Sequence, residues 1–264
     1  MNKVVVIMGA AGGIGRAITD KFVIWLSQLP LDLPVGTPMN KHFVYAVDTE
    51  KKLSFLTKHY HSPVKDNAQI LRLACNVINF TEIERFFKNE QEIDILVNAA
   101  GILPEPNPFV KTDNKIAKKT MEVNLWGMWN CCRSVLPIMR AQKYGRIVNI
   151  SSIAAQSGDP GNTAYAISKV AVEKLTKQLA LEAVYCKEGE TPPDITVNAV
   201  APGIVDTPMT AGLSEKALEK YFERSPLKRK IKPEEVAEAV YFLATASAAI
   251  NGIILPVDGG YLAS

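Results

Sequence analysis

Short apolar runs recur along the chain, separated by longer segments in which apolar residues follow a helical spacing. The runs are rich in valine and isoleucine, which is typical of strands buried on both faces of a parallel sheet. The predicted strands cover Lys3–Met8, His42–Val47, Gln69–Ala74, Ile93–Val97, Arg146–Ile150, Ile195–Val200 and Ile253–Val257. Pro256 places the last of these at a sheet edge or at the end of the strand.

Helices are predicted over Arg16–Gln28, Thr49–Tyr60, Thr81–Asn89, Asp113–Arg140, Thr163–Cys186 and Pro233–Ala244. Proline-containing loops occupy Leu29–Asn40 and Lys187–Pro193, and Thr210–Lys232 is a charged helical excursion. Strands that alternate with helices predict an α/β fold, a Rossmann-type doubly wound parallel β-sheet flanked by helices. The length of 264 residues suits a single domain over residues 1–264, and no internal repeat is visible.

Composition excludes several classes of function. The net charge of +3 is small and gives no case for a nucleic-acid partner. No apolar run is long enough to span a membrane, and the first strand begins at Lys3, which leaves no room for a signal peptide. The cysteines show neither paired spacing nor a nearby histidine, so we expect no metal site and a cytoplasmic protein with reduced thiols.

The first predicted strand runs into a glycine-rich stretch, Gly9-Ala-Ala-Gly12-Gly13-Ile14-Gly15. Strand, glycine loop and helix form the first unit of a dinucleotide-binding sheet, in which the backbone approaches a pyrophosphate at the helix N-terminus. A tight turn without a ligand is the alternative. Asp48, which follows the second strand, is placed to bind ribose hydroxyls or to cap the next helix, and both roles can coexist.

Two further stretches carry candidate site residues. The fourth strand ends in Asn98-Ala99-Ala100-Gly101, whose small side chains would let a flat ring lie close to the backbone. Asn124 is a polar residue inside the long predicted helix. Its position alone fits a functional amide and a structurally satisfied one equally well.

The candidate chemistry lies between Ser152 and Lys169. Tyr165 and Lys169 are four residues apart, so in a helix both side chains share one face. An ammonium close to a phenol favours the phenolate, which helps the tyrosine to give or take a proton. Ser152 follows the fifth strand, and its hydroxyl could hold a substrate oxygen beside the phenol. Reduction of a carbonyl needs such a group, a proton donor and a hydride source.

Together these motifs resemble the short-chain dehydrogenase/reductase family, from Lys3 to about Gly260. The glycine loop is similar to TGxxxGxG, with Met8 where Thr is usual, and Asn98–Gly101 is similar to NNAG. Asn124, Ser152, Tyr165 and Lys169 match the catalytic tetrad of the family, at the right intervals. Pro202-Gly203 with Thr207, and Val257-Asp-Gly-Gly260, resemble its PGxxxT and VDGG motifs. Any one motif is weak, whereas the ordered set is specific.

The resemblance implies a role for each of these residues. Tyr165 would be the general acid in reduction, Lys169 would favour its phenolate and bind the nicotinamide ribose, and Ser152 would hold the substrate oxygen. Asn124 would anchor a water that links Lys169 to solvent. The implied cofactor contacts are Gly9, Gly13, Ile14, Gly15, Asp48, Asn76, Val77, Asn98, Ala99, Ala100, Gly101, Tyr165, Lys169, Pro202, Ile204 and Thr207.

The resemblance also implies a homotetramer formed through the helices that bear Asn124 and Tyr165, and a substrate lid at about residues 207–232. The first functional hypothesis is an NAD(H)-dependent oxidoreductase that interconverts a secondary alcohol and a ketone. A 3-oxoacyl-thioester reductase that uses NADPH is the second, and a non-catalytic dinucleotide-binding assembly or regulatory protein is the third. The basic cluster Lys228, Arg229, Lys230 and Lys232 could meet an acidic carrier or form a solvated loop.

Charge predicts the choice between the two nicotinamide cofactors. NADP carries a phosphate on the adenosine ribose, which proteins usually neutralise with Arg or Lys. In the family that the chain resembles, a basic residue for this phosphate commonly precedes the middle glycine of the loop. Here that position is Gly12, which has no charge, and Asp48 puts a carboxylate where the phosphate would lie. NAD is therefore expected rather than NADP, although Lys51 and Lys52 follow closely and could swing toward a phosphate.

Overall fold

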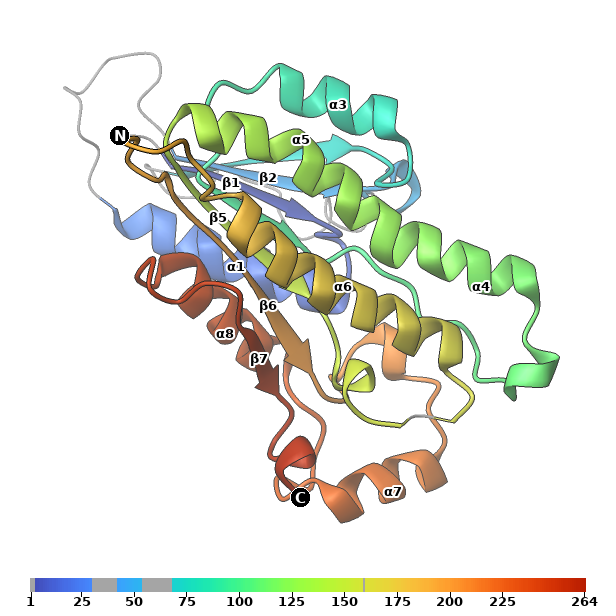
Figure 1. Ribbon diagram of the computed structural model, residues 1–264. Coiled ribbons are helices and arrows are strands. Elements are labelled where there is room, and N and C mark those ends of the chain that lie inside the picture. The colour runs from blue at the N-terminus through green and yellow to red at the C-terminus, as the bar shows by residue number, and fades with distance from the viewer. Residues whose placement is uncertain (1–2, 30–41, 54–67, 159) are drawn as a thin grey trace.

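The protein is built around a seven-stranded parallel β-sheet (Figure 1). The computed structural model describes residues 3–29, 42–53, 68–158 and 160–264. The strand order is β3-β2-β1-β4-β5-β6-β7, and every neighbouring pair is parallel. The doubly wound sheet predicted from the sequence is confirmed, and β7, which contains Pro256, is an edge strand as that proline predicts.

The bounds of the elements are as follows. The strands are β1 (Val4–Met8), β2 (His42–Asp48), β3 (Ala68–Ala74), β4 (Ile95–Asn98), β5 (Tyr144–Ile150), β6 (Asp194–Pro202) and β7 (Ile254–Val257). The α-helices are α1 (Gly13–Gln28), α3 (Phe80–Lys88), α4 (Asn114–Met121), α5 (Gly127–Ala141), α6 (Thr163–Glu182), α7 (Glu215–Arg224) and α8 (Pro233–Thr245). Short helical turns are η1 (Phe109–Lys111), the π-helical η2 (Glu122–Trp126), η3 (Ile153–Ala155), η4 (Pro208–Thr210) and η5 (Tyr261–Ala263).

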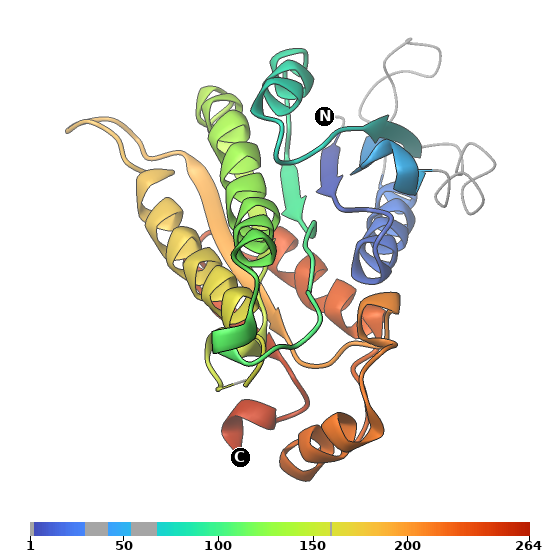
Figure 2. The same cartoon turned by 90° about the vertical axis from the view of Figure 1, so that its right-hand side faces the viewer.

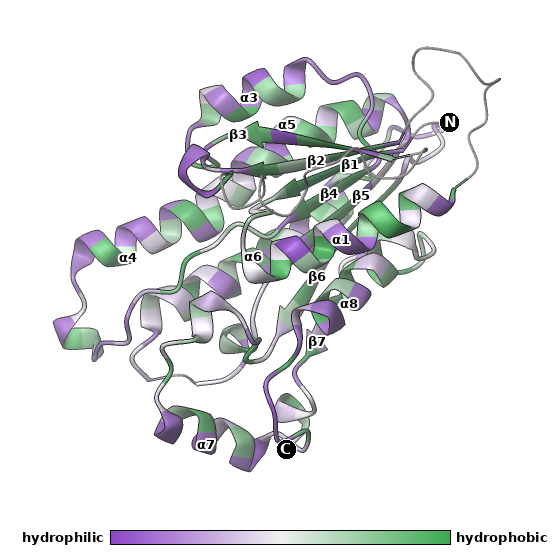
Figure 3. Ribbon diagram, turned by 180° about the vertical axis from the view of Figure 1, so that it is seen from behind, coloured by the Kyte–Doolittle hydropathy of each residue, from purple (hydrophilic) through white to green (hydrophobic). Residues whose placement is uncertain are grey.

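Helices cover both faces of the sheet (Figure 2). On one face α1 and α8 pack against each other and against the strands, and on the other lie α3, α5 and α6. Figure 3 shows the strands as largely hydrophobic segments, whereas α7 carries many hydrophilic residues. Because both faces of the sheet are covered, its central strands need apolar side chains on both sides, which explains the unbroken apolar runs of the sequence.

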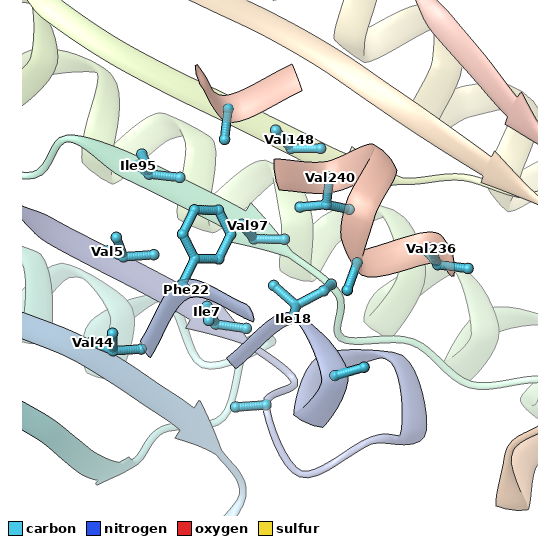
Figure 4. Close-up of a cluster of buried hydrophobic side chains, with 14 of the residues drawn as sticks. Val5, Ile7, Ile18, Phe22, Val44, Ile95, Val97, Val148, Val236 and Val240 are labelled. Carbon is cyan, nitrogen blue, oxygen red and sulfur yellow. The ribbon is translucent and has the colours of Figure 1, made fainter. Parts of the chain in front are cut away.

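The core on the α1 side is centred on Phe22, which is completely buried. Figure 4 shows its ring over the strand residues and near Val240 of α8. The ring also meets that of Tyr241 edge-on, with the centroids 6.1 Å apart. Met8, which replaces a usual threonine of the family motif, belongs to the core on the other face, where it adds apolar volume in place of a hydroxyl. These two cores fix the strand ends that carry the site.

The prediction of one long helix over Asp113–Arg140 is wrong in detail. A π-helical turn separates α4 from α5 in this range. Asp113 is the N-cap, and its carboxylate accepts a hydrogen bond from the Lys115 amide at 2.7 Å. The π turn, η2, contains Asn124. Single π turns inside α-helices commonly mark functional sites, because the extra residue changes the direction of the side chains. The hydrophobic period of the sequence does not report such a turn.

Other boundaries shift by a few residues. β4 begins at Ile95 rather than Ile93, and α6 ends at Glu182 rather than Cys186. The reason at α6 is Arg140, whose guanidinium donates to the Glu182 and Tyr185 carbonyls at 2.9 and 2.7 Å and so replaces the next helical turn. Of the predicted helix Thr49–Tyr60, residues 50–53 are helical, Thr49 precedes them, and residues 54–60 lie outside the described residues, as does nearly all of the predicted loop Leu29–Asn40.

Candidate active site

Most of the predicted site residues lie on segments that leave the carboxyl ends of β1 to β6, and these ends share one edge of the sheet (Figure 1). From β1 the chain moves outward to β2 and β3, and it then returns to place β4 on the other side of β1. Such a reversal of strand order opens a crevice at the carboxyl edge of a doubly wound sheet, where ligands bind. The sheet topology therefore brings together segments that lie far apart in the sequence.

Three glycines hold the loop after β1 against two other segments of the site. Gly9 has a φ of +84°, and a Cβ there would lie 2.5 Å from the amide nitrogen of Ala100. A Cβ on Gly13 would lie 2.5 Å from Cγ2 of Thr207, and one on Gly15 would overlap the carbonyl oxygen of Gly9. The loop thus presents bare backbone at the N-terminus of α1, which fits a pyrophosphate.

Asp48 ties the end of β2 to this glycine loop. It is 7% exposed, and its carboxylate accepts hydrogen bonds from the Ala11 amide at 3.1 Å and the Thr49 amide at 2.8 Å. The helical turn over residues 50–53 begins at Thr49, whose carbonyl accepts from Leu53, so Thr49 rather than Asp48 is at the N-cap position. A carboxylate can accept about four hydrogen bonds, so Asp48 keeps the capacity to bind ribose hydroxyls.

Lys169 is the buried charge of the site. It is 4% exposed, its Nζ donates to the Ile150 carbonyl at 2.8 Å, and it lies 5.6 Å from the centroid of the Tyr165 ring. Burial lowers the pKa of Lys169 from 10.5 to about 8, because water no longer solvates the ammonium. A Cβ on Gly101 would lie 3.8 Å from this nitrogen, so the chain after β4 passes close to the ammonium. Tyr165 and Lys169 share one face of α6, as their spacing predicts.

Asn124 is fully buried and its side chain is satisfied within the protein. Its Oδ1 accepts from the Ile102 amide at 2.8 Å, and its Nδ2 donates to the Ile102 carbonyl and to Oγ of Ser168, both at 3.0 Å. Ser168 in turn donates to the Tyr165 carbonyl at 2.6 Å. Both amide hydrogens are engaged, so the side chain has none left to donate to a water beside Lys169. The side chain fixes η2 to the chain after β4 and to α6, and the role of Asn124 as a water anchor stays a prediction.

Ser152 follows β5 and is half-buried. Its Oγ accepts a hydrogen bond from the Ala154 amide at 3.2 Å, which caps η3. A hydroxyl that accepts this bond still has its own hydrogen to donate, so Ser152 can bind a carbonyl oxygen. The grouping of Ser152, Tyr165 and Lys169 can therefore orient a carbonyl and deliver a proton to it.

Two predicted cofactor contacts have side chains that serve the protein interior instead. Nδ2 of Asn98 donates to Oδ1 of Asn149 at 2.9 Å and ties β4 to β5. Val77 packs on α5, where a Cβ on Gly127 would lie 2.6 Å from its Cγ2. Both side chains are buried, and the Oδ1 of Asn98 has no hydrogen-bond partner among the described residues, so contacts of Asn98 and Val77 to a cofactor stay a prediction. Asn76 is exposed just after β3.

The remaining predicted contacts lie at the same edge of the sheet. Ala99 donates its amide to the Met8 carbonyl at 2.9 Å, which joins the ends of β1 and β4. Pro202 ends β6, and the Ile204 carbonyl accepts from the Ile231 amide at 2.8 Å, so the turn after β6 is fixed to the end of the predicted lid. Ile14, in the first turn of α1, packs against the core on the α1 side.

Sequence reasoning missed Ser168 and the backbone of Ile102 and Ile150, which hold Asn124 and Lys169 in place. Ser168 is next to Lys169 and three residues after Tyr165, a spacing that could have suggested contact with the preceding turn of the helix. The two backbone groups leave no signal in the sequence, because any residue supplies a carbonyl and all but proline supply an amide hydrogen.

The basic cluster predicted at residues 228–232 is bonded within the chain. Arg229 makes a two-pronged pair with Glu235, with N–O distances of 2.8 and 2.7 Å. Lys230 lies 3.4 Å from a carboxylate oxygen of Asp206, and Lys228 donates to the Glu223 carbonyl at 3.0 Å. These contacts offset part of the positive charge of the cluster and favour a solvated loop over a site for an acidic carrier.

Within residues 3–29, 42–53, 68–158 and 160–264, no group of histidine, cysteine or carboxylate side chains could hold a metal ion. In the same ranges no helix is both long and apolar enough to cross a membrane.

The lowered pKa of Lys169 makes stability depend on pH. The folded pKa is about 8 and the ordinary value 10.5, so between these values the unfolded chain binds the extra proton and stability rises with pH. We expect Lys169→Met, measured by urea unfolding at pH 7, to raise the free energy of unfolding by roughly 1–3 kcal/mol, and this gain to shrink as the pH approaches 10. The exposed Lys174→Met is the control and should change little at any pH. A loss of stability in Lys169→Met that is the same at every pH would contradict the buried charge.

Comparison with known proteins gives the family. A family model described as "Enoyl-(Acyl carrier protein) reductase" matches residues 43–262. The chain is 36% identical over 260 residues to the 3-oxoacyl-[acyl-carrier-protein] reductase FabG of Thermotoga maritima, covering 98% of this chain and 97% of that protein.

Two solved structures share the fold. A short-chain type dehydrogenase/reductase from Mycobacterium ulcerans has a TM-score of 0.85 at 22% identity, covering 100% of this chain and 90% of the other. The structure of ElxO with NADP bound has a TM-score of 0.79 at 27% identity, covering 100% of both chains. The chain therefore belongs to the short-chain dehydrogenase/reductase family and is an oxidoreductase with a nicotinamide dinucleotide cofactor.

Proposed function

We propose that the protein interconverts a 3-oxoacyl thioester and the corresponding 3-hydroxyacyl thioester. The observation that carries this substrate class is the similarity to the Thermotoga maritima reductase, which extends over nearly the whole of both chains. The grouping of Ser152, Tyr165 and Lys169 supports the reaction type. Of the hypotheses from the sequence, the thioester reductase is therefore better supported than a general alcohol dehydrogenase.

The proposed reaction assigns one task to each side chain. A bound nicotinamide dinucleotide supplies the hydride. Ser152 donates a hydrogen bond to the oxygen of the 3-oxo group, and Tyr165 gives its proton to the same oxygen. One carbonyl, one hydride and one proton make the alcohol, and Lys169 stabilises the phenolate that remains. Oxidation runs through the same groups in reverse. Asn124 positions η2 and, through Ser168, the first turn of α6.

The other two hypotheses differ in what they require of the site. A dehydrogenase of simple secondary alcohols would use the same side chains and would differ only in the substrate it accepts. A non-catalytic dinucleotide-binding protein needs the glycine loop and Asp48. It does not need a buried ammonium beside a phenol, nor a nearby serine hydroxyl with a hydrogen to donate. The arrangement of Lys169, Tyr165 and Ser152 therefore opposes the non-catalytic hypothesis.

We propose that residues at about 207–232 form a lid over the substrate and that only its first part moves. The end of α7 is attached to the C-terminal segment, because the Tyr221 hydroxyl donates to the Asp258 carbonyl at 3.1 Å and its ring stacks on Tyr261. Arg224 donates to the Tyr261 hydroxyl at 3.1 Å. With the far end anchored in this way, closure over an acyl chain would involve η4 and the residues before α7.

The substrate class and the role of Tyr165 are tested together by steady-state kinetics with acetoacetyl-N-acetylcysteamine, acetoacetyl-CoA and simple ketones. We expect the thioesters to be reduced most efficiently. Tyr165→Phe should lower kcat by about 10²–10⁴-fold, because the proton is lost while the ring remains. Dinucleotide binding, measured by fluorescence, should be nearly unchanged. Turnover retained in Tyr165→Phe would refute the tyrosine as the acid, and turnover of ketones alone would refute the substrate class.

We further propose that NAD(H) is preferred over NADP(H). The Asp48 carboxylate is fixed by the Ala11 and Thr49 amides, so it cannot easily swing away from the adenosine ribose. Two unit charges 4 Å apart repel by about 4 kcal/mol at an effective dielectric constant of 20. Against this stands ElxO, which was solved with NADP bound. Lys51 and Lys52, which follow Asp48, are exposed.

The preference is measured as the ratio of kcat/KM with NADH to that with NADPH. We expect a ratio above one in the wild type and a smaller ratio in Asp48→Ala. The variant loses hydrogen bonds to the ribose of NADH, which weakens NADH binding, and it no longer repels the ribose phosphate of NADPH. Glu50→Ala removes an exposed carboxylate two residues later and is the matched control, which should leave the ratio unchanged. A wild type that works better with NADPH would overturn the proposal.

We propose that copies of the chain associate through α5 and α6, as the predicted tetramer requires. Trp126 and Trp129 are 51% and 42% exposed, and a groove of about 630 Å³ runs between the two helices. It is lined mainly by Trp129, Leu136, Pro137, Leu175 and Leu179. An apolar groove of this kind is normally covered by a partner, and symmetric self-association is the usual means.

Light scattering at micromolar concentration should give the mass of a tetramer. Trp129→Glu should dissociate it, because the substitution places a charge in the apolar contact. Ile24→Glu, which changes an apolar side chain that is 57% exposed on the opposite layer, should leave the mass unchanged. A wild type that is a monomer would refute the interface.

A further inference from the structure

A carboxylate extends the catalytic face of α6 by one more turn. Tyr165, Lys169 and Glu173 are spaced four residues apart, so their side chains lie in one row along the helix. The proposed reaction uses the first two and gives no role to Glu173. Glu173 lies beside the segment that leaves β5, which is the segment that carries Ser152.

One oxygen of Glu173 holds both ends of this segment. Oε1 accepts a hydrogen bond from Oγ of Ser151 at 3.1 Å and another from Nε2 of Gln156 at 3.0 Å. Ser151 is 2% exposed, so its hydroxyl needs a partner inside the protein. Hydrogen bonds to a charged carboxylate are stronger than those between neutral groups. Ser152 and η3 lie between the two attachment points.

The same helix also contacts the start of the segment, because Nζ of Lys169 donates to the Ile150 carbonyl. α6 therefore positions Tyr165 directly and positions Ser152 through contacts at residues 150, 151 and 156. The Ser152 hydroxyl and the Tyr165 phenol must both reach one carbonyl oxygen. The positions of both groups are therefore set by contacts with α6. Catalytic groups need this support, since a displacement of about 1 Å can cost about 10²-fold in rate.

We propose that Glu173 is a positioning residue that sets the Ser152 hydroxyl at its working distance from the Tyr165 phenol. The inference rests on the proposed role of Ser152 as the group that holds the substrate oxygen, and it does not depend on the substrate class. Glu173 acts through Ser151 and Gln156 and need not touch the substrate. Loss of the Glu173 carboxylate should therefore lower the rate only in a protein that still has the Ser152 hydroxyl.

A double-mutant cycle tests this directly, with whichever carbonyl substrate the wild type reduces. Glu173→Ala should lower kcat/KM by about 10- to 100-fold with an unchanged dinucleotide Kd. In a Ser152→Ala background the same substitution should have almost no effect, because the group it positions is gone. Glu173→Gln should keep most of the activity, since its amide oxygen can accept both hydrogen bonds. An equal loss in both backgrounds, or a Gln variant as poor as Ala, would overturn the proposal.

A second variant keeps the test decisive if Glu173→Ala folds poorly. Gln156→Ala removes only the exposed attachment point and leaves the buried Ser151 contact intact. It should give a smaller loss of kcat/KM, which also disappears in the Ser152→Ala background. A loss that persists there would overturn the proposal. A wild type that reduces no carbonyl at all would instead refute the proposed function.

Discussion

A positive charge enclosed by protein is the constraint on which the site depends. The Lys169 ammonium is cut off from water, so it must be satisfied by groups that the fold brings to it, and the Ile150 carbonyl is the first of these. Burial lowers its pKa to about 8, which means that the charge is held at a cost in stability. Such a cost points to a function, and we propose that the function is to stabilise the phenolate of Tyr165, whose ring centroid lies 5.6 Å from the Lys169 nitrogen.

The sheet supplies the other conditions for this chemistry. β1, β4, β5 and β6 end at one edge, and the reversal of strand order between β1 and β4 opens the crevice there. The segments of the crevice are joined by close contacts that leave no room for a side chain on the glycine. Gly9 contacts Ala100 in this way, and Gly13 contacts Thr207. The glycine loop, the chain after β4 and the turn after β6 therefore form a single wall. A shift in one of these segments would move the others.

Much of this architecture could be predicted from the sequence, because the fold requires particular residue types at particular positions. Strands covered on both faces must be continuously apolar, and a backbone that approaches a pyrophosphate must be glycine. The π turn at Asn124, the inward side chain of Asn98 and the hydrogen bonds of Glu173 to Ser151 and Gln156 could not be predicted in this way. Each depends on which of several polar partners a side chain finds after folding. The Arg229–Glu235 pair is a similar case, since the sequence shows only a cluster of basic residues.

The central claim is that this crevice transfers a hydride to the 3-oxo carbon of an acyl thioester. Mass spectrometry of the product formed with nicotinamide dinucleotide deuterated at the reactive position of the ring tests it most directly. The account predicts a 3-hydroxyacyl thioester with one deuterium on C3 and an unlabelled hydroxyl after work-up in ordinary water. Recovery of the unreacted 3-oxoacyl thioester, or of a reduced product without deuterium on C3, would contradict it.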